Sequence, residues 1–400
     1  MSGSHHRLST LALLLLLFCS CIKRPTDTST LTCMDQLGWN DTSDTHPKNA
    51  DFTKLIEDLT ATGLPGISLM IEDEHGLWHK SSGYADIDHK TPMQICHLSK
   101  IASVSKLFTA VLIYRLRDQG KLKLDDSVKW YVYKKHIKRI KNLEHSTIRD
   151  LLSHSSGIYD IVFDQQFILN TFNNLDKEKS YESLLQMAYD KPADFAYGSK
   201  RSYNQTLNHV LLAMIINKVT GNDHAVMLHK EIFSPLNMNE SYIRPSDNLP
   251  WNQVAKGYYD YRSEGLLQDL TPLYTGDGKG FTGIYTTVND LRKFIAALYK
   301  HKTLISPNSY ADMVEIPSLD NTLACAGGCR AMRIKVNGND YTWYGHPGGE
   351  VNYAAGAFYC PEKNATITFT VNYGVAFTNM GKYTDAYFAF RDKLFEVVSQ

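Results

Sequence analysis

The order of apolar and polar positions along the chain changes twice. Near the N-terminus, two short β-prone runs at 66–72 and 77–81 flank an Asp-Glu-His-Gly turn and predict a hairpin. From residue 103 to about 271 the pattern is mainly helical, with apolar helices predicted at 106–119 and 210–219 and a capping box that starts a helix at Thr147-x-x-Asp150. After a helix that begins at Thr287, strands are predicted again at 331–336, 341–344, 353–359 and 365–371, with an Asn337-Gly338 turn between the first two, and then a last helix at 382–398.

This order predicts an α+β fold. Strands from both ends of the chain can share one antiparallel β-sheet flanked by helices, with a mainly helical lobe, about residues 104–271, inserted between them. The helix at 106–119 is apolar almost all round, which is typical of a buried central helix, and Gly120 is a natural stop. We therefore expect one composite domain over residues 51–400.

The N-terminal segment has the pattern of a targeting signal. A short apolar run at 11–18 follows His5-His6-Arg7 and is too short to span a membrane as a helix. Cys19-Ser20-Cys21 follows it and resembles a bacterial lipobox, which predicts a lipoprotein signal peptide over 1–21 and lipidation of Cys21. Residues 22–50 are rich in Thr, Asp, Ser and Asn and predict a flexible tether. We expect a lipid-anchored protein on the periplasmic side of the cell envelope, or a secreted one if Cys21 is not lipidated.

The composition narrows the classes of partner. With 43% hydrophobic and 21% charged residues and a formal net charge of zero, the chain has an ordinary core and is not specialised for polyanions. The basic run at 134–141 follows three aromatic residues, and a solvated helix face is favoured over a nucleic-acid or anionic-envelope patch. Gly278–Gly283 matches G-x-G-x-x-G without a βαβ frame, so it is interpreted as a turn. No cofactor and no nucleic acid are expected.

Five cysteines follow the predicted signal peptide, so at least one is left without a cysteine partner. Cys325-Ala-Gly-Gly-Cys329 could close a small disulfide loop in an oxidising compartment. A zinc site is not favoured, because no second pair of ligands lies at metal-binding spacing.

Ser103-Val104-Ser105-Lys106 is the strongest chemical signal. On a helix, residues three apart share a face, so the Lys106 amine can reach the Ser103 hydroxyl. The helix N-terminus favours an oxyanion at Ser103 and a deprotonated Lys106, because its N–H groups and dipole are positive there. A neutral lysine can act as a base toward a serine nucleophile.

Further motifs accompany this pair in order along the chain. By them the chain resembles the serine β-lactamase and penicillin-binding protein family, and within it the class C β-lactamases, DD-carboxypeptidases and related esterases. The resemblance covers about residues 52–398 and implies a β-lactamase/transpeptidase-like fold. The motifs are Gly83–Asp88 with Thr91–Met93, Ile101–Lys106, Leu124–Val128, Thr147–Gly157 and Tyr344–Gly349.

The resemblance implies a role for each matching residue. Ser103 would be the acylated nucleophile, Lys106 its partner, and Tyr203 the general base and leaving-group acid. His346 would begin the third motif, and a charged His346 would help to keep Lys106 neutral. The backbone N–H groups of Ser103 and Gly349 would form the oxyanion hole.

Two departures from the family pattern affect substrate binding. The second motif usually reads Tyr-x-Asn, but here Tyr203 is followed by Asn204-Gln205, so either residue could bond the substrate. In the third motif, Pro347 precedes the predicted substrate-binding Gly348 and has neither hydroxyl nor N–H. A contact often made to a substrate carboxylate is therefore lost.

These observations predict a serine hydrolase that acts on amide or ester bonds through an acyl-enzyme. A penicillin-binding-protein-like D-alanyl-D-alanine carboxypeptidase or peptidase heads the expected activities. A class C-type β-lactamase or an esterase on the same site is the alternative, so the substrate is a peptide, an ester or a β-lactam. A penicillin-recognising binding protein without turnover remains a third.

Overall fold

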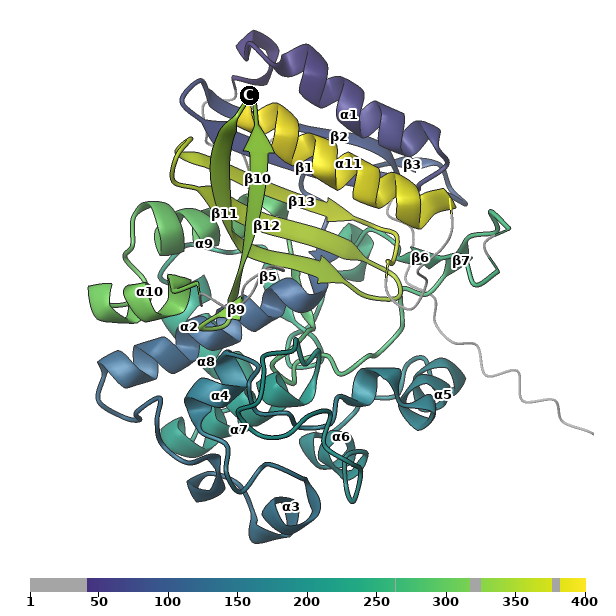
Figure 1. Cartoon of the computed structure of the whole chain (residues 1–400). Coiled ribbons are helices and arrows are strands. Elements are labelled where there is room, and N and C mark those ends of the chain that lie inside the picture. Colours follow the sequence, from purple (N-terminus) through teal and green to yellow (C-terminus); the bar gives the residue numbers. More distant parts are fainter. Residues whose placement is uncertain (1–41, 263, 317–324, 376–381) are drawn as a thin grey trace, which may run out of the picture.

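One eight-stranded sheet joins the two ends of the chain (Figure 1). The structure, a computed structural model, describes residues 42–262, 264–316, 325–375 and 382–400. The strand order is β3-β2-β1-β13-β12-β11-β10-β9, and neighbouring strands are antiparallel. The strands are β1 (Gly66–Asp73), β2 (Gly76–Asp86), β3 (Thr91–Pro92), β9 (Cys325–Ala326), β10 (Cys329–Val336), β11 (Asn339–Gly349), β12 (Ala354–Cys360) and β13 (Ala365–Val371).

The predicted sharing of the sheet by both chain ends is confirmed. β1 pairs with β13, with Ile67 opposite Val371. Val336 lies opposite Asn339, so β10 and β11 form a hairpin closed by the two-residue Asn337-Gly338 turn that the sequence indicated.

The two faces of the sheet are covered by different helices. α1 (Asn49–Ala61) and α11 (Lys382–Ser399) lie side by side on one face (Figure 1). There Phe52 packs against Trp78 and Phe395 against Trp343, each pair with ring centroids 5.1 Å apart. Successive strand residues point to opposite faces of the sheet. Thr368 of β13 points to the face opposite α1 and α11, where its hydroxyl donates a hydrogen bond to the Val288 carbonyl of α9 (Val288–Ile295).

The mainly helical lobe lies below the sheet in Figure 1. Its central helix is α2 (Ser105–Asp118), of which eleven of fourteen residues are buried. The Phe108 ring of α2 stacks on Phe294 of α9 at 3.6 Å between centroids, which ties the lobe to the helix under the sheet. The other helices of this lobe are η3 (Val128–Trp130), α3 (Lys134–Arg139), α4 (Ile148–Leu152), η4 (Ile161–Phe163), α5 (Gln165–Asn173), α6 (Tyr181–Gln186), α7 (Leu207–Thr220), α8 (His224–Leu228) and η5 (His229–Phe233).

Local sequence signals set several helix ends. Thr147 and Asp150 form the predicted capping box at the start of α4, and Thr287 caps α9 through its hydroxyl. Gly221 ends α7 in the left-handed conformation, with φ 71°.

Short elements connect the lobe to the sheet. β8 (Ile284–Thr286) pairs with both β4 (Ser99–Lys100) and β5 (Ser241–Ile243), and β4 leads directly into η2 (Ala102–Val104). The remaining elements are η1 (Ser43–Thr45), η6 (Trp251–Gln253), β6 (Tyr258–Tyr259), β7 (Gln268–Asp269), η7 (Ala296–Lys300) and α10 (Pro307–Val314).

The packed structure begins before the predicted domain start at residue 51. The Thr42 amide donates to the Leu77 carbonyl, and the Ser43 hydroxyl donates to the His79 carbonyl of β2. The segment 42–50, assigned to the tether from its composition, therefore contacts the sheet. The predicted signal peptide, including Cys21, lies outside the described residues. Among the described helices, none combines the length and apolarity that crossing a membrane would require.

The disulfide that Cys325 and Cys329 could have closed is not formed by Cys329. Cys329 is a buried thiol whose Sγ donates to the Met313 carbonyl at 3.1 Å. Cys96, by contrast, is disulfide-bonded. Short spacing between two cysteines did not predict which of them pairs.

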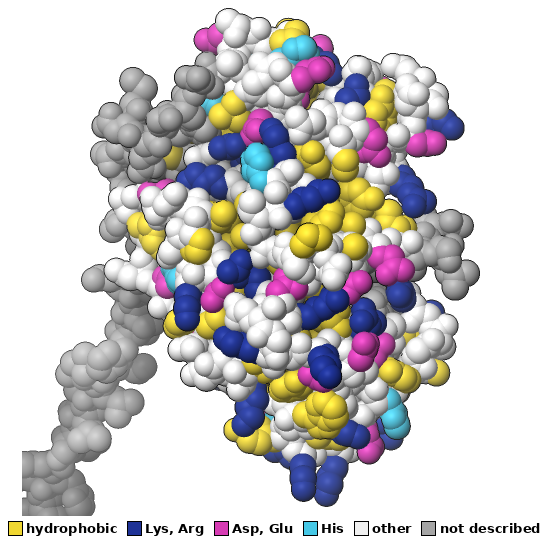
Figure 2. Space-filling model, turned by 90° about the vertical axis from the view of Figure 1, so that its left-hand side faces the viewer, with side chains coloured by type: hydrophobic (Ala, Val, Ile, Leu, Met, Phe, Trp, Pro, Cys, Tyr) yellow, Lys and Arg dark blue, Asp and Glu magenta, His cyan; other side chains and the backbone are white. Residues whose placement is uncertain are grey.

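The basic run at 134–141 forms the exposed helix α3 and its end. Two of its cations have acidic partners, because Lys135 pairs with Glu182 and Arg139 with Asp190. On the face drawn in Figure 2, basic and acidic side chains are interspersed over the whole surface. Mixed charges of this kind are typical of a solvated surface, which is the favoured interpretation of the run.

Candidate active site

Ser103 lies on the short turn η2, between β4 and the buried helix α2. The Lys106 amine donates a hydrogen bond to Ser103 Oγ at 2.7 Å, so the structure brings together the hydroxyl and amine that the spacing predicted. Ser103 precedes the first residue of α2 by two positions and does not cap it through its side chain. Ala102 has φ 47°, a left-handed conformation that is strained for a residue with a Cβ.

Lys106 is fully buried, and burial lowers its pKa to about 7. The carboxylates of Asp160 and Glu350 oppose this shift, and the Arg330 guanidinium reinforces it. Lys106 can therefore be a neutral amine near neutral pH, and a neutral amine can accept the Ser103 proton.

The end of β11 lies against the nucleophile turn because Gly348 has no side chain. A Cβ at this position would lie 2.4 Å from the Ile101 carbonyl oxygen and 3.3 Å from the Ala102 Cβ. Gly349 follows and lines the same pocket as Ser103. The two backbones expected to form an oxyanion hole thus come from a turn and a strand more than 240 residues apart in the sequence.

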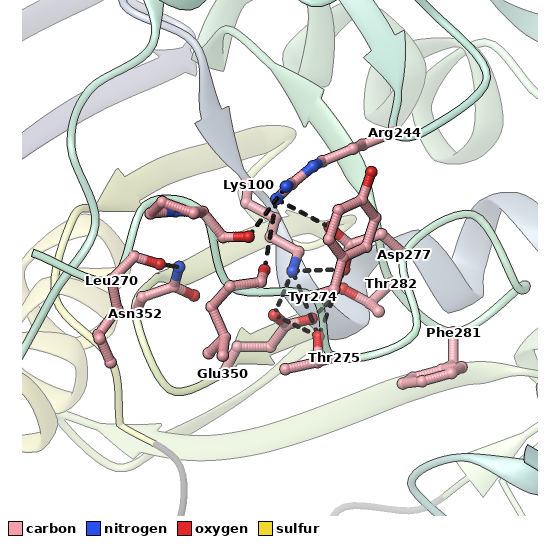
Figure 3. A network of polar contacts seen from close by, with 12 residues as sticks. Lys100, Arg244, Leu270, Tyr274, Thr275, Asp277, Phe281, Thr282, Glu350 and Asn352 are labelled. Carbon is pink, nitrogen blue, oxygen red and sulfur yellow. Dashed lines mark hydrogen bonds and ion pairs between the residues drawn. The ribbon is translucent and has the colours of Figure 1, made fainter. Parts of the chain in front are cut away.

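This pocket has apolar walls and several polar groups. Figure 3 draws part of the pocket lining, including Thr275 and Phe281. A pocket with apolar walls and few polar groups is the usual form of a small-substrate site. It is lined by Ser103, Val162, Phe167, Gln205, Thr206, Thr275, Phe281, Gly349, Glu350 and Val351.

Tyr203 lies beside the predicted catalytic amine. The centre of its ring is 5.4 Å from Lys106 Nζ and 5.9 Å from the centre of the His346 ring. The His154 ring lies 4.8 Å from it on another side, and His154 Nδ1 accepts a hydrogen bond from the Asn204 amide. His154, which comes from the Leu-Ser-His-Ser-Ser-Gly motif, therefore helps to hold the segment that carries Tyr203.

The two candidates for the second-motif polar residue differ in their contacts. Asn204 is 5% exposed, and its Nδ2 donates to the Ile158 carbonyl at 2.9 Å. Its Oδ1 accepts hydrogen bonds from the backbone amides of Thr206 and Asn208, so this side chain holds the scaffold together. Gln205 lines the pocket instead, so of the two residues it is the one that can contact a substrate.

A half-buried carboxylate, Asp160, holds Gln205 and the following residue in place. Asp160 accepts a hydrogen bond from the Gln205 amide at 2.6 Å and another from the Thr206 hydroxyl at 2.7 Å. Burial raises the Asp160 pKa, and these hydrogen bonds act in the opposite direction.

His346 does not carry the charge suggested for it. It is 2% exposed, and burial together with the cations Lys106 and Arg330 holds its pKa well below the usual range. Its Nδ1 lies 2.6 Å from the Pro347 carbonyl oxygen, which can only accept, so the neutral ring carries its proton on Nδ1. His346 is therefore a neutral side chain beside Tyr203.

Arg330 is the cation of the site, and the sequence reasoning missed it. Its guanidinium carbon lies 4.6 Å from the centre of the Tyr203 ring. No salt bridge to Arg330 is present in the described part of the chain. The predicted Asn337-Gly338 turn is the sequence signal that could have identified Arg330. A two-residue hairpin turn there places Arg330 opposite Gly345, beside His346.

A second group of charges lies under the pocket (Figure 3). The Lys100 amine contacts Asp277 at 2.6 Å and Glu350 at 2.7 Å, and all three residues are buried. Burial lowers the Lys100 pKa, but the two carboxylates outweigh it and raise the pKa above its ordinary value, so Lys100 remains charged. The sequence analysis did not single out any of these residues.

Among the described residues, no three His, Cys, Asp or Glu side chains are grouped as metal ligands would be. The site geometry rests on Ser103, Lys106 and the groups around them.

Comparison with known proteins finds relatives of this chain. A family model described as Beta-lactamase matches residues 52–386. "Penicillin-binding protein 4*" of Bacillus subtilis (strain 168) is 31% identical over 252 residues, which are 59% of this chain and 52% of that protein. "Teichoic acid D-alanine hydrolase" of Staphylococcus aureus is 26% identical over 261 residues, which are 65% of this chain and 60% of that protein. The chain thus spans about half to three fifths of the length of these curated relatives.

The same fold occurs in solved structures. A D-amino acid amidase from Ochrobactrum anthropi SV3, complexed with L-phenylalanine, superimposes with a TM-score of 0.76. The match covers 88% of this chain and 99% of the amidase at 22% sequence identity. This likeness shows that the two chains share a fold.

Proposed function

The chain belongs to the beta-lactamase family of serine hydrolases, and from that premise we propose that it is a D-alanyl-D-alanine carboxypeptidase with Ser103 as nucleophile. The observation that carries this proposal is the 2.7 Å hydrogen bond between Lys106 and Ser103, made by an amine whose pKa is lowered to about 7. An amine of this kind can take the serine proton near neutral pH.

Acylation begins when Ser103 Oγ attacks the carbonyl carbon of the scissile amide. The Ser103 proton passes to Lys106 Nζ, and the new oxyanion accepts hydrogen bonds from the backbone N–H groups of Ser103 and Gly349. The C–N bond then breaks as the departing amine takes a proton from Lys106 or through Tyr203. Water repeats the attack on the ester, releases the acid and restores Ser103.

Arg330 supports a carboxylate-ended substrate. Its guanidinium lies beside Tyr203, next to the place where the leaving group would depart, and it has no salt bridge within the described residues. A guanidinium binds a carboxylate through two parallel hydrogen bonds. Arg330 thus offers the leaving D-alanine the contact that the missing hydroxyl at Pro347 cannot make.

Hydrolysis of D-alanyl esters or amides is the second candidate, and Pro347 is the observation that favours it. A site without the third-motif hydroxyl depends less on a substrate carboxylate, and two proteins similar to this chain are a teichoic acid D-alanine hydrolase and a D-amino acid amidase. A β-lactamase or a binding protein without turnover would use the same Ser103.

The test is time-resolved intact mass of the chain without residues 1–21 with a penicillin, alongside Ser103→Ala. A Ser103-dependent adduct that persists for minutes is expected, and rapid loss of the adduct with product formation would indicate a β-lactamase instead. D-Ala-D-Ala peptides and p-nitrophenyl esters of D-alanine are then compared as substrates. Cleavage of the esters alone would replace the carboxypeptidase with the esterase, and a permanent adduct with every substrate would indicate a binding protein.

We also propose that the mature protein is anchored at the cell envelope through a lipid on Cys21. The support is the apolar run followed by Cys19-Ser20-Cys21. Expression of the full chain in bacteria with a labelled fatty acid should label the wild type and not Cys21→Ala. Equal labelling of both would overturn the proposal.

A further inference from the structure

Two buried side chains of opposite charge join the segments that carry the expected oxyanion-hole donors. Lys100 precedes Ser103 by three residues, and Glu350 directly follows Gly349. Lys100 Nζ and Glu350 Oε2 are 2.7 Å apart (Figure 3). The Lys100 side chain is completely buried, and 9% of the Glu350 side chain is exposed.

The main chain around both residues is fixed. Lys100 lies on β4, and the Ile101 amide that follows it donates to the Ile284 carbonyl of β8. At the other segment, the Glu350 amide donates to the Tyr353 carbonyl, and its own carbonyl accepts from Val375. The ion pair therefore connects two rigid segments.

A glycine-rich loop, residues 275–283, closes the network from a third direction. Thr275 Oγ1 lies 2.9 Å from Glu350 Oε2, and the Thr282 hydroxyl donates to Glu350 Oε1. Asp277 holds Lys100 from the same loop, at 2.6 Å. The loop contains the G-x-G-x-x-G sequence, and its Phe281 carbonyl oxygen lies 3.4 Å from Lys106 Nζ.

We propose that Lys100 and Glu350 are positioning residues whose ion pair sets the separation of the Ser103 and Gly349 backbone N–H groups. The proposal rests on the proposed function, because it concerns the oxyanion hole of that reaction. In this role the Lys100–Glu350 pair supports catalysis without any need to contact the substrate.

The energetics favour positioning over stability. A buried ion pair loses hydration of both charges, and replacing such a pair by apolar side chains is often neutral or stabilising. The contact between Lys100 and Glu350 is short and directional, and both side chains make further hydrogen bonds. The pair therefore fixes the distance between the two segments that carry it. An oxyanion hole needs this, because its donors must lie about 2.7–3.1 Å from one developing oxyanion.

The test measures how fast a p-nitrophenyl methylphosphonate ester labels Ser103. Ser103 Oγ forms a bond to phosphorus, p-nitrophenolate leaves, the serine proton passes to Lys106, and the phosphoryl oxygen occupies the hole. The chain from residue 22 onward, without the predicted signal peptide, is compared as wild type, Lys100→Met, Glu350→Gln, the double variant and Asp277→Asn. Asp277→Asn is the matched control, since it removes a carboxylate from the same amine but leaves the Lys100–Glu350 contact. Measurement at about pH 9 keeps Lys106 neutral in all variants.

We expect Lys100→Met and Glu350→Gln each to slow labelling by about 100-fold, the loss typical of one misplaced oxyanion donor. The double variant should be no slower than the slower single variant, because both changes break one contact. Asp277→Asn should slow the labelling of Ser103 much less. The wild-type preference for the P=O reagent over its P=S analogue should also shrink in the two single variants, which a change in stability alone would not cause.

Equal losses in Asp277→Asn and Glu350→Gln, or an unchanged preference for P=O, would overturn the positioning role. A wild type that labels no faster than Ser103→Ala would overturn both this role and the proposed nucleophile. A wild type that labels rapidly yet leaves D-alanyl peptides intact would remove the proposed substrate and leave the positioning role standing.

Discussion

The guanidinium of Arg330 lies 4.6 Å from the centre of the Tyr203 ring, on the hairpin strand that pairs with the strand of His346. This permanent positive charge replaces the charged His346 suggested by the sequence. It helps to lower the Lys106 pKa, and it is placed to attract an anionic leaving group.

We predict that acylation of Ser103 depends on a group with a pKa near 7. Lys106 must be neutral to accept the serine proton, so kcat/KM should rise about tenfold per pH unit below pH 7 and level off above it. Stopped-flow acylation with a chromogenic ester between about pH 5 and pH 9 measures this. Lys106→Ala should be slow at every pH, and a flat wild-type profile would contradict the role of the amine.

Arg330→Met should change both the pH profile and substrate selection. Loss of the guanidinium removes an influence that lowers the Lys106 pKa, so the midpoint of the acylation profile should move to higher pH. KM for a D-Ala-D-Ala peptide should rise by about tenfold, as for loss of a charged hydrogen bond, whereas KM for the peptide's C-terminal amide should stay unchanged. Equal effects on the acid and the amide would argue against a carboxylate site at Arg330.

Gln205→Ala and Asn204→Ala should separate substrate binding from scaffold stability. Gln205 lines the pocket, so its loss should raise KM with little change in the thermal unfolding midpoint. Asn204 holds three backbone groups from a buried position, so its loss should reduce the free energy of unfolding by about 2–3 kcal/mol. Kinetics and thermal unfolding of the two variants, measured side by side, check this. The reverse pattern would return Asn204 to the substrate site.

Gly348→Ala should nearly abolish acylation. The added methyl group would lie 2.4 Å from the Ile101 carbonyl oxygen, so β11 and the Ser103 turn must move apart. A loss of 100-fold or more in kcat/KM is expected, as for removal of an oxyanion donor. The ester assay measures it at a pH above 7, where the acylation profile has levelled off. A variant with full activity would show that the close approach of these segments is not needed.

Local signals were sufficient for most of the fold. Periodicity predicted the hairpin of β1 and β2, the strands β10 to β13 and the last helix, and the Thr147 capping box formed as expected. The same signals failed for Cys329, whose short spacing to another cysteine indicated a disulfide that the thiol does not form. Periodicity and caps report on neighbours along the chain, whereas pairing of cysteines depends on distances in space.

The sequence by itself determined the α+β architecture and brought Ser103 and Lys106 together, because alternation along strands and spacing along helices are short-range properties. The tertiary structure alone decided that His346 is neutral and Arg330 is the charge beside Tyr203, that Gln205 and not Asn204 lines the pocket, and that Lys100 contacts Glu350. Protonation, side-chain direction and ion pairing depend on burial and on contacts between segments far apart in the chain, and a linear pattern does not contain these.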